Sequence, residues 1–208
     1  MEVLTIFTLL ILLFSVIIHE VSHGGVAYAL GDTTAKNEGR LSLNPLVHID
    51  PVGSILLPLF LVMLNMPVIA WAKPVPVNPL NFNDRKWGDL KVSLAGPLSN
   101  LSVALVFGLI IKFMPFLPQS FLTIAAIVVF YNIVLALFNL IPVPSLDGSH
   151  ILFSLLPERF NSFKIFLWQY GFIILLLLIF IIPGGLNWIF NFAQSVLVFL
   201  FGSGALFT

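Results

Sequence analysis

Hydrophobic residues occur in long runs along this chain, and short polar connections separate the runs. A helix needs about 20 consecutive apolar residues to cross a bilayer, so windows of this length are typical of transmembrane spans. The windows lie at about 3–30, 91–114, 121–142, 165–182 and 186–202, with a further, proline-containing one at about 52–72. This pattern predicts an all-α polytopic membrane protein with about five to six transmembrane helices.

The composition agrees with this interpretation and limits the chemistry that the chain can perform. Of the 208 residues, 59% are hydrophobic and 9% are charged, and the formal net charge of zero argues against a nucleic-acid partner. The chain has no cysteine, so any metal site must use His, Asp, Glu or Asn side chains. The connections are too short for a soluble domain of ordinary size, which predicts a single integral-membrane domain over 1–208.

An ionisable cluster, His19-Glu20-Val21-Ser22-His23, lies near the end of the first apolar window. Ionisable side chains in a membrane segment are costly, and they favour a functional explanation. At 3.6 residues per turn, His19 and His23 share one helix face and can reach one metal ion, while Glu20 projects beside them. Zinc hydrolases use two such ligands and a carboxylate that accepts a proton from metal-bound water. The spacing predicts this chemistry and leaves the third ligand open.

A second polar segment, Asn139-Leu140-Ile141-Pro142-Val143-Pro144-Ser145-Leu146-Asp147-Gly148, closes another apolar window. Prolines break a helix and free backbone groups, which is tolerated at membrane depth only where the segment is buried in protein or lines a wet cavity. Asp147 is therefore expected at such a cavity. An ordinary turn or capping aspartate is the alternative for this residue taken alone.

Together these segments resemble the site-2 protease family of intramembrane zinc metalloproteases, in its compact prokaryotic form without a PDZ-like or nucleotide-binding appendage. The family pairs a membrane-embedded HExxH with a distant Asn-x-x-Pro-x-x-x-Leu-Asp-Gly segment, and this chain has both. Two further segments are similar to family elements, Ala95-Gly96-Pro97-Leu98-Ser99-Asn100 and the stretch from Asn44 to Gly53. The resemblance covers roughly residues 15–155.

The resemblance implies hydrolysis of peptide bonds in or next to transmembrane segments of membrane-protein substrates. It implies one zinc ion per chain held by His19, His23 and Asp147, with Glu20 as the catalytic base. It also implies that Asn139 positions the substrate backbone or the oxyanion. The catalytic core would then span about 3–155, with accessory helices at about 165–202.

The two halves of this site can meet only in some topologies. If the window at 52–72 crossed the bilayer fully, Asp147 would lie on the face opposite His23 and the site could not close. Pro58 and Pro67 make a break in this window plausible, so we expect it to be re-entrant, entering and leaving on one side.

The charge distribution supports the re-entrant topology. One side then carries eight of the nine basic residues, and the other carries Lys112 alone. The basic side should be cytoplasmic. We therefore expect an integral protein of a prokaryotic cell membrane, with the N-terminus outside, the C-terminus inside and the active site toward the cytoplasm.

Other polar residues have two interpretations each. His48 and His150 could contact a metal ligand, or they could be loop residues, and for His48 a hydrogen bond that fixes the re-entrant turn is favoured. Asn100 and Asn132 lie within apolar windows, where hydrogen bonding between helices is the simplest explanation. For Asn100, a place in substrate binding at the cavity is the alternative.

Two other classes of protein could place His and Asp at membrane depth. A metal-ion transporter would spread its ligands along a pathway, and it would give Glu20 no special position. A catalytically inactive membrane scaffold would be expected to lose one of the four site residues, and this chain retains all of them. The sequence therefore favours the protease, whose partners would be a transmembrane substrate and the bilayer.

Overall fold

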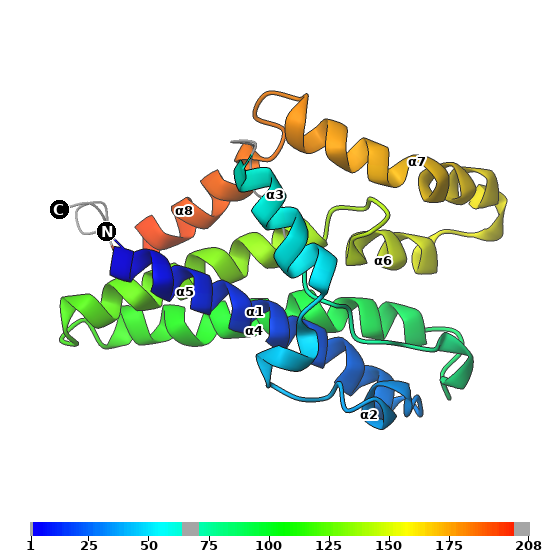
Figure 1. The fold of residues 1–208 in the computed structure, drawn as a ribbon, viewed down its shortest axis with the longest axis horizontal. Helices are drawn as coiled ribbons and strands as arrows, with labels where there is room; N and C mark the ends of the chain where they lie inside the picture. Colours follow the sequence, from blue (N-terminus) through cyan, green and yellow to red (C-terminus); the bar gives the residue numbers. More distant parts are fainter. Residues whose placement is uncertain (1, 64–70, 202–208) are drawn as a thin grey trace.

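The computed structural model describes residues 2–63 and 71–201, and this part of the chain contains helices and no strands. Figure 1 shows how the helices are arranged. In chain order the elements are α1 (Glu2–Ala29), α2 (Thr34–Asn37), η1 (Pro45–His48), η2 (Pro51–Leu56), α3 (Leu57–Met63), η3 (Pro79–Asn81), α4 (Gly88–Phe113), α5 (Gln119–Asn139), α6 (Asp147–Leu155), η4 (Glu158–Phe160), α7 (Asn161–Phe180) and α8 (Asn187–Phe201). The predicted all-α fold is confirmed.

Four helices in the described part are long and apolar enough to cross a membrane. They cover Leu4–Ala29, Gly88–Phe113, Gln119–Asn139 and Glu158–Phe180. The fifth expected span is the apolar helix α8, which has 15 residues. At 1.5 Å per residue it is about 22 Å long, shorter than the roughly 30 Å hydrocarbon core. Four full spans and one shorter apolar helix therefore account for the five regular windows.

The helices α1, α4 and α5 lie side by side and form the centre of the molecule (Figure 1). The connection before α4 lies beside the end of α1, because the Asn83 N–H donates to the Leu30 carbonyl at 2.8 Å. Helix α4 therefore starts where α1 ends and runs back along it. Helix α5 then returns, so that the segment after Asn139 comes back to the half of α1 that carries His19 and His23.

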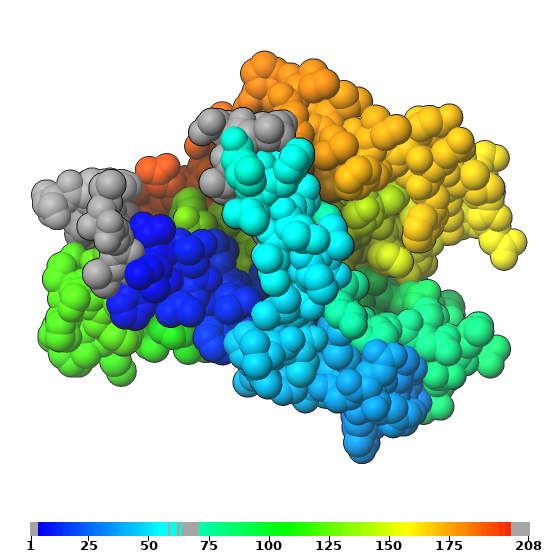
Figure 2. Space-filling view, viewed as in Figure 1, coloured from blue at the N-terminus to red at the C-terminus, as the bar shows by residue number. Residues whose placement is uncertain are grey.

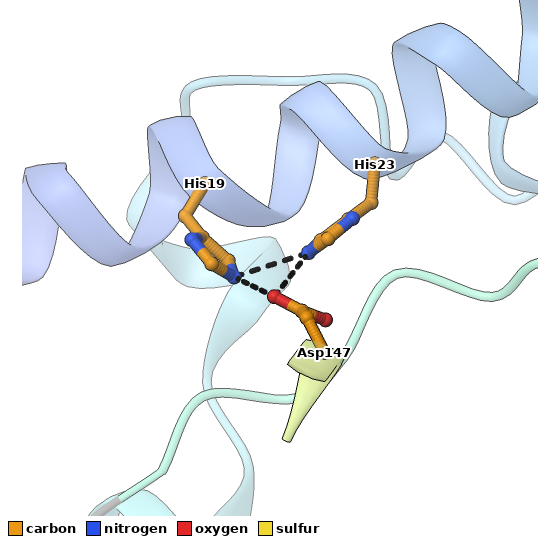
Figure 3. Close-up of side chains that lie close together, drawn as sticks. All are labelled: His19, His23 and Asp147. Carbon is orange, nitrogen blue, oxygen red and sulfur yellow. Dashed lines mark hydrogen bonds and ion pairs between the residues drawn. The ribbon is translucent and has the colours of Figure 1, made fainter. Parts of the chain in front are cut away.

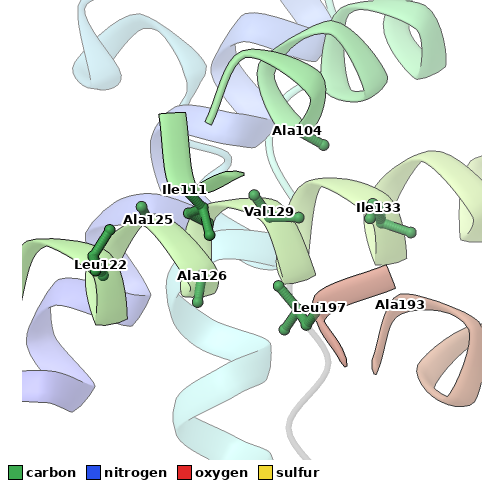
Figure 4. Close-up of a cluster of buried hydrophobic side chains, with 9 residues drawn as sticks. All are labelled: Ala104, Ile111, Leu122, Ala125, Ala126, Val129, Ile133, Ala193 and Leu197. Atoms are coloured by element: carbon green, nitrogen blue, oxygen red, sulfur yellow. The ribbon is translucent and has the colours of Figure 1, made fainter. Parts of the chain in front are cut away.

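One buried cluster joins α4, α5 and α8 (Figure 4). Because lipid tails are as apolar as leucine, helices in a membrane associate mainly through close packing, which small residues at the interface permit. Four of the nine cluster members are alanines. The cluster consists of Ala104, Ile111, Leu122, Ala125, Ala126, Val129, Ile133, Ala193 and Leu197.

A layer of buried polar side chains crosses the middle of the helix bundle. Asn100 of α4 donates to the Asn132 amide oxygen of α5 at 2.8 Å, and to the Ser15 carbonyl of α1 at 3.2 Å. Asn132 in turn donates to the Ser15 hydroxyl at 2.9 Å. Hydrogen bonds of this kind fix the rotation and height of neighbouring membrane helices. The expected bonding between helices by these two amides is confirmed.

The two ends of the window at 52–72 lie next to each other. The Trp71 N–H donates to the Gly53 carbonyl at 3.2 Å, and the Ser54 hydroxyl donates to the Trp71 carbonyl at 2.8 Å. Residues 64–70, with Pro67, lie outside the described residues. Because its two ends pair with each other, this window does not carry the chain to the other end of the bundle, as a re-entrant segment requires. Figure 2 shows α3, in cyan, over the middle of one face of the molecule.

Candidate metal centre

His19, His23 and Asp147 meet at one point in the interior (Figure 3). The Nε2 atoms of the two histidines are 3.0 Å apart. Asp147 Oδ2 lies 3.0 Å from Nε2 of His19 and 3.3 Å from Nε2 of His23. The structure therefore brings together the two halves of the predicted metal site, one from α1 and one from the start of α6.

Hydrogen bonds on the far side of each imidazole fix which nitrogen faces the centre. Nδ1 of His19 lies 2.7 Å from the Asn100 amide oxygen, and Nδ1 of His23 lies 2.7 Å from the Val92 carbonyl. Both partners accept hydrogen bonds, so each Nδ1 carries the proton in a neutral imidazole. The amide of Asn100 is oriented in turn, because its nitrogen donates to the Ser15 carbonyl. Both Nε2 lone pairs are thus presented to the centre.

Gly96 lets α4 approach the two histidines. A Cβ atom at this position would collide with Nε2 of both His19 and His23. Only glycine fits at this position, and because it has no side chain, the α4 backbone can pack directly against the imidazoles. This contact also places Val92 and Asn100, one turn before and one turn after Gly96, beside the Nδ1 atoms.

The conformation of the connection between α5 and α6 places Asp147 at the metal centre. Ser145 has φ of 88°, in the left-handed region that few residues other than glycine adopt, and Leu146 is extended. A Cβ on Gly148 would collide with the carbonyls of Leu140 and Ile141, so the turn folds tightly on itself. The segment is held from outside by α7, where Gly171 leaves room for the Pro144 ring. Pro144 is thus buried in protein, as a helix break at membrane depth requires, whereas Pro142 is exposed.

The donor set fits a zinc ion. Asp147 Oδ2 is buried and has no hydrogen-bond donor among the described residues, while two Nε2 lone pairs point at it. Three electron pairs that converge in this way repel one another unless a cation lies between them. Two imidazole nitrogens and one carboxylate oxygen form a set typical of catalytic zinc, which keeps its fourth position open.

Glu20 is half-buried beside these ligands and forms no ion pair in the described part of the chain. Its Oε2 accepts a hydrogen bond from the Val75 backbone N–H at 2.9 Å. The other carboxylate oxygen, Oε1, accepts no hydrogen bond from the described residues. Glu20 is thus available for proton transfer, and its side chain is held by a segment that sequence reasoning did not connect with it.

The other predicted residues lie around this centre in different roles. Asn100 is fully buried at 0% exposure and contacts His19, so the structure places it behind a ligand rather than on an open substrate face. Asn139 is half-buried, and its amide donates to the Leu135 carbonyl at 2.9 Å. The motif Ala95 to Asn100 was the signal that could have predicted the contact with His19.

Neither of the remaining histidines contacts a metal ligand. The ring of His48 is buried, with Nε2 2.7 Å from the Ser42 carbonyl, and the carbonyl of His48 accepts from the Lys73 N–H at 2.9 Å. The favoured interpretation of His48, a residue that fixes the re-entrant turn, agrees with these bonds. His150 lies edge-on to the Trp168 ring, with 6.2 Å between centroids, and makes no hydrogen bond to Asp147, because it points toward α7.

Comparison with known proteins gives related chains from two bacteria. The chain is 39% identical over 186 residues to YwhC of Bacillus subtilis, an alignment that covers 84% of this chain and 80% of that protein. It is 30% identical over 180 residues to Rip2 of Mycolicibacterium smegmatis, covering 86% of this chain and 68% of that protein. Both proteins carry the name "Putative zinc metalloprotease". No solved structure gives a significant match.

The family comparison agrees with these relatives. The sequence model of peptidase family M50 matches residues 115–178, which include Asn139 and Asp147. The similarity to YwhC extends well beyond this segment, over most of both chains. The chain therefore belongs to peptidase family M50, the site-2 protease family of intramembrane zinc metalloproteases.

Proposed function

We propose that this chain is a zinc-dependent endopeptidase of the HExxH type that cuts transmembrane protein substrates. In this proposal His19, His23 and Asp147 hold one zinc ion per chain, and Glu20 is the general base. The observation that carries it is the meeting of two Nε2 atoms and Asp147 Oδ2, from separate helices, within 4.8 Å of one another. A transporter would need no carboxylate such as Glu20 beside a closed set of three ligands.

In the proposed reaction, the metal site, Glu20 and Asn139 have separate roles. When bound, zinc would polarise the scissile carbonyl and lower the pKa of water at its open position. The Glu20 carboxylate takes the proton of the attacking water and delivers it to the leaving amine. Asn139 retains an amide oxygen and one N–H beyond its bond to Leu135, and we assign these to the substrate backbone. The substrate helix must unwind locally, since its own hydrogen bonds shield the scissile carbonyl.

A measurement of zinc content together with cleavage tests the proposed function. The purified protein is assayed for zinc per chain and for hydrolysis of single-span membrane proteins, which are found by comparing membrane fragments from cells with wild-type and Glu20→Gln protein. One zinc per chain with cleavage supports the proposal. Metal flux without cleavage would indicate a transporter, and neither activity would indicate a scaffold.

The hydrogen bond from His19 to Asn100 leads to a prediction for zinc affinity. In the Asn100→Ala variant, the His19 ring loses the acceptor that fixes its tautomer and orientation. Loss of such a partner of a metal-bound histidine typically weakens metal binding about 10–100-fold. Competition with a chelator measures this change.

Asn132→Ala is the matched control for Asn100→Ala. It removes the other fully buried amide of the same layer, yet it leaves the hydrogen bond between Asn100 and His19 in place. We expect a smaller loss of zinc affinity for this variant. Equal zinc affinity in the wild type and Asn100→Ala would contradict the assigned role.

The orientation in the membrane is a further part of the proposal, with the N-terminus outside and the zinc site near the cytoplasm. Because the chain lacks cysteine, single cysteines can be introduced at exposed positions at opposite ends of the bundle, Glu38→Cys after α1 and Ser120→Cys at the start of α5. We expect a membrane-impermeant thiol reagent to label Ser120→Cys in intact cells, and Glu38→Cys only after the membrane is opened. The reverse pattern would overturn the orientation.

A further inference from the structure

We propose that the Val75 backbone N–H positions the Glu20 carboxylate, and that Arg40 holds the segment that carries this N–H. The inference rests on the proposed role of Glu20 as the base. Its starting observation is the 2.9 Å hydrogen bond from the Val75 N–H to Glu20 Oε2. The donor belongs to residues 72–78, here called the strap, a stretch without regular secondary structure between Trp71 and η3.

The sequence of the strap leaves one backbone donor at its centre. Val75 stands between Pro74 and Pro76, neither of which has an N–H. A residue before proline is restricted to extended conformations, so the backbone of Val75 is stiff. The Val75 side chain is buried and would collide with a Cβ on Gly24, one turn after Glu20. Local sequence and packing together therefore aim a single N–H at α1.

Arg40 holds the first half of the strap. Its Nη2 donates to the Lys73 carbonyl at 2.7 Å and to the Pro74 carbonyl at 3.1 Å. The side chain is 4% exposed and forms no ion pair with any described residue. Burial of a cation is costly without partners. The two carbonyls directly before Val75 supply these partners, so the buried Arg40 guanidinium holds the backbone of the strap at this point. The Lys73 N–H is bound as well, by the His48 carbonyl.

Asp32 holds the other end of the strap. Its Oδ2 accepts from the Asn78 N–H at 2.7 Å, and its Oδ1 accepts from the Asn81 side chain at 2.8 Å. Burial alone would raise the pKa of Asp32, but the hydrogen bonds from Asn78, Thr34 and Asn81 hold it below its ordinary value, so the residue is a carboxylate. The strap is thus fixed on both sides of Val75 by buried charged side chains.

Fixing Oε2 of Glu20 has a consequence for catalysis. A glutamate has three side-chain torsions, and one hydrogen bond at the carboxylate removes most of this freedom. The N–H engages Oε2 and leaves Oε1 for the proton of the attacking water. Val75 and Arg40 are therefore positioning residues, which act through Glu20 and do not touch the reacting atoms.

Removal of the N–H tests the proposal. Val75→Pro deletes this donor. Val77→Pro is the matched control, because it also adds a proline to the strap but removes an N–H that has no hydrogen-bond acceptor in the described part of the chain. General bases contribute about 10²–10⁴-fold to rate, so we expect kcat of Val75→Pro to fall about tenfold or more. KM and zinc content should stay unchanged, and kcat of Val77→Pro should stay within about twofold of the wild type. An unchanged kcat for Val75→Pro would overturn the inference.

Hydrogen exchange provides a readout that does not depend on activity. A peptide spanning 73–77 has exchangeable amides only at Lys73, Val75 and Val77, since the other two residues are prolines. We expect faster exchange in this peptide for Glu20→Ala, which removes the acceptor, and for Arg40→Met, which releases the strap. Ser22→Ala, whose hydroxyl bonds the Ile18 carbonyl, should leave the exchange unchanged.

The outcomes separate this inference from the proposed function. If Glu20→Gln still cleaves substrate, the role of Glu20 as base fails, and exchange at Val75 still decides whether the hydrogen bond exists. If Glu20→Gln is inactive while Val75→Pro retains full kcat, only the positioning role fails. Unchanged exchange in Glu20→Ala would show that the contact is absent, and unchanged exchange in Arg40→Met would remove Arg40 from the proposal.

Discussion

We expect the Glu20→Gln variant to lose most of its peptide-bond hydrolysis and to keep its zinc ion. The amide has the size of the carboxylate and keeps an oxygen that can accept from the Val75 N–H, so the packing around α1 need not change. It cannot take a proton from water, however, and the rate should fall by about 10²–10⁴-fold. The ligand atoms of His19, His23 and Asp147 are untouched.

The measurement combines zinc per chain with the cleavage rate of a single-span substrate. Glu38→Gln makes the same chemical change at an exposed glutamate and should behave as the wild type. A Glu20→Gln protein that retains zinc and full activity would exclude Glu20 as the base. A variant that loses zinc would instead assign Glu20 a structural role at the metal centre.

The positions of the long helices could be predicted because bilayer thickness sets their length. The windows at 3–30 and 91–114 correspond closely to α1 and α4. The last window, 186–202, likewise corresponds to α8 (Asn187–Phe201), whose 15 residues are fewer than a helix needs to cross the bilayer.

The ligands could be predicted because their spacing encodes geometry. His19 and His23 are one helical turn apart, and Asp147 follows prolines that break α5 at membrane depth. The role of Asn100 was harder to predict, because it depends on the rotation of α4, which the contact of Gly96 with the histidines fixes. A hydrophobic pattern with little amphipathicity does not define this rotation.

The contact of Val75 with Glu20 could not be predicted from residue types. Valine has no polar side chain, and its contribution is a backbone N–H that every residue except proline possesses. Only the path of the strap brings this group to Glu20. That path is fixed by Arg40 and Asp32, which are far from the strap in the sequence. Interactions of this kind depend on tertiary structure, and the sequence shows only the prolines that make the strap stiff.

Asp147→Ala should lose both zinc and hydrolysis, in contrast to Glu20→Gln. The variant retains two imidazole ligands and lacks the carboxylate oxygen that completes the set, so the loss of zinc affinity should exceed the 10–100-fold expected when a partner of a ligand is removed. Asp84→Ala is the control, because it removes an aspartate that pairs with Lys91 at 2.7 Å on the surface, where solvent screens the ion pair.

Thermal unfolding distinguishes loss of the ligand from loss of the fold. Each variant is unfolded both without and with zinc, so that any effect of Asp147 on the metal-free fold is measured separately from its effect on zinc binding. Zinc at about 100 times its Kd should stabilise the wild type and Glu20→Gln by about 2.7 kcal/mol, and it should leave the Tm of Asp147→Ala unchanged. If zinc raised the Tm of Asp147→Ala as much as that of the wild type, Asp147 would not be a ligand, and the third donor would have to lie elsewhere in the chain.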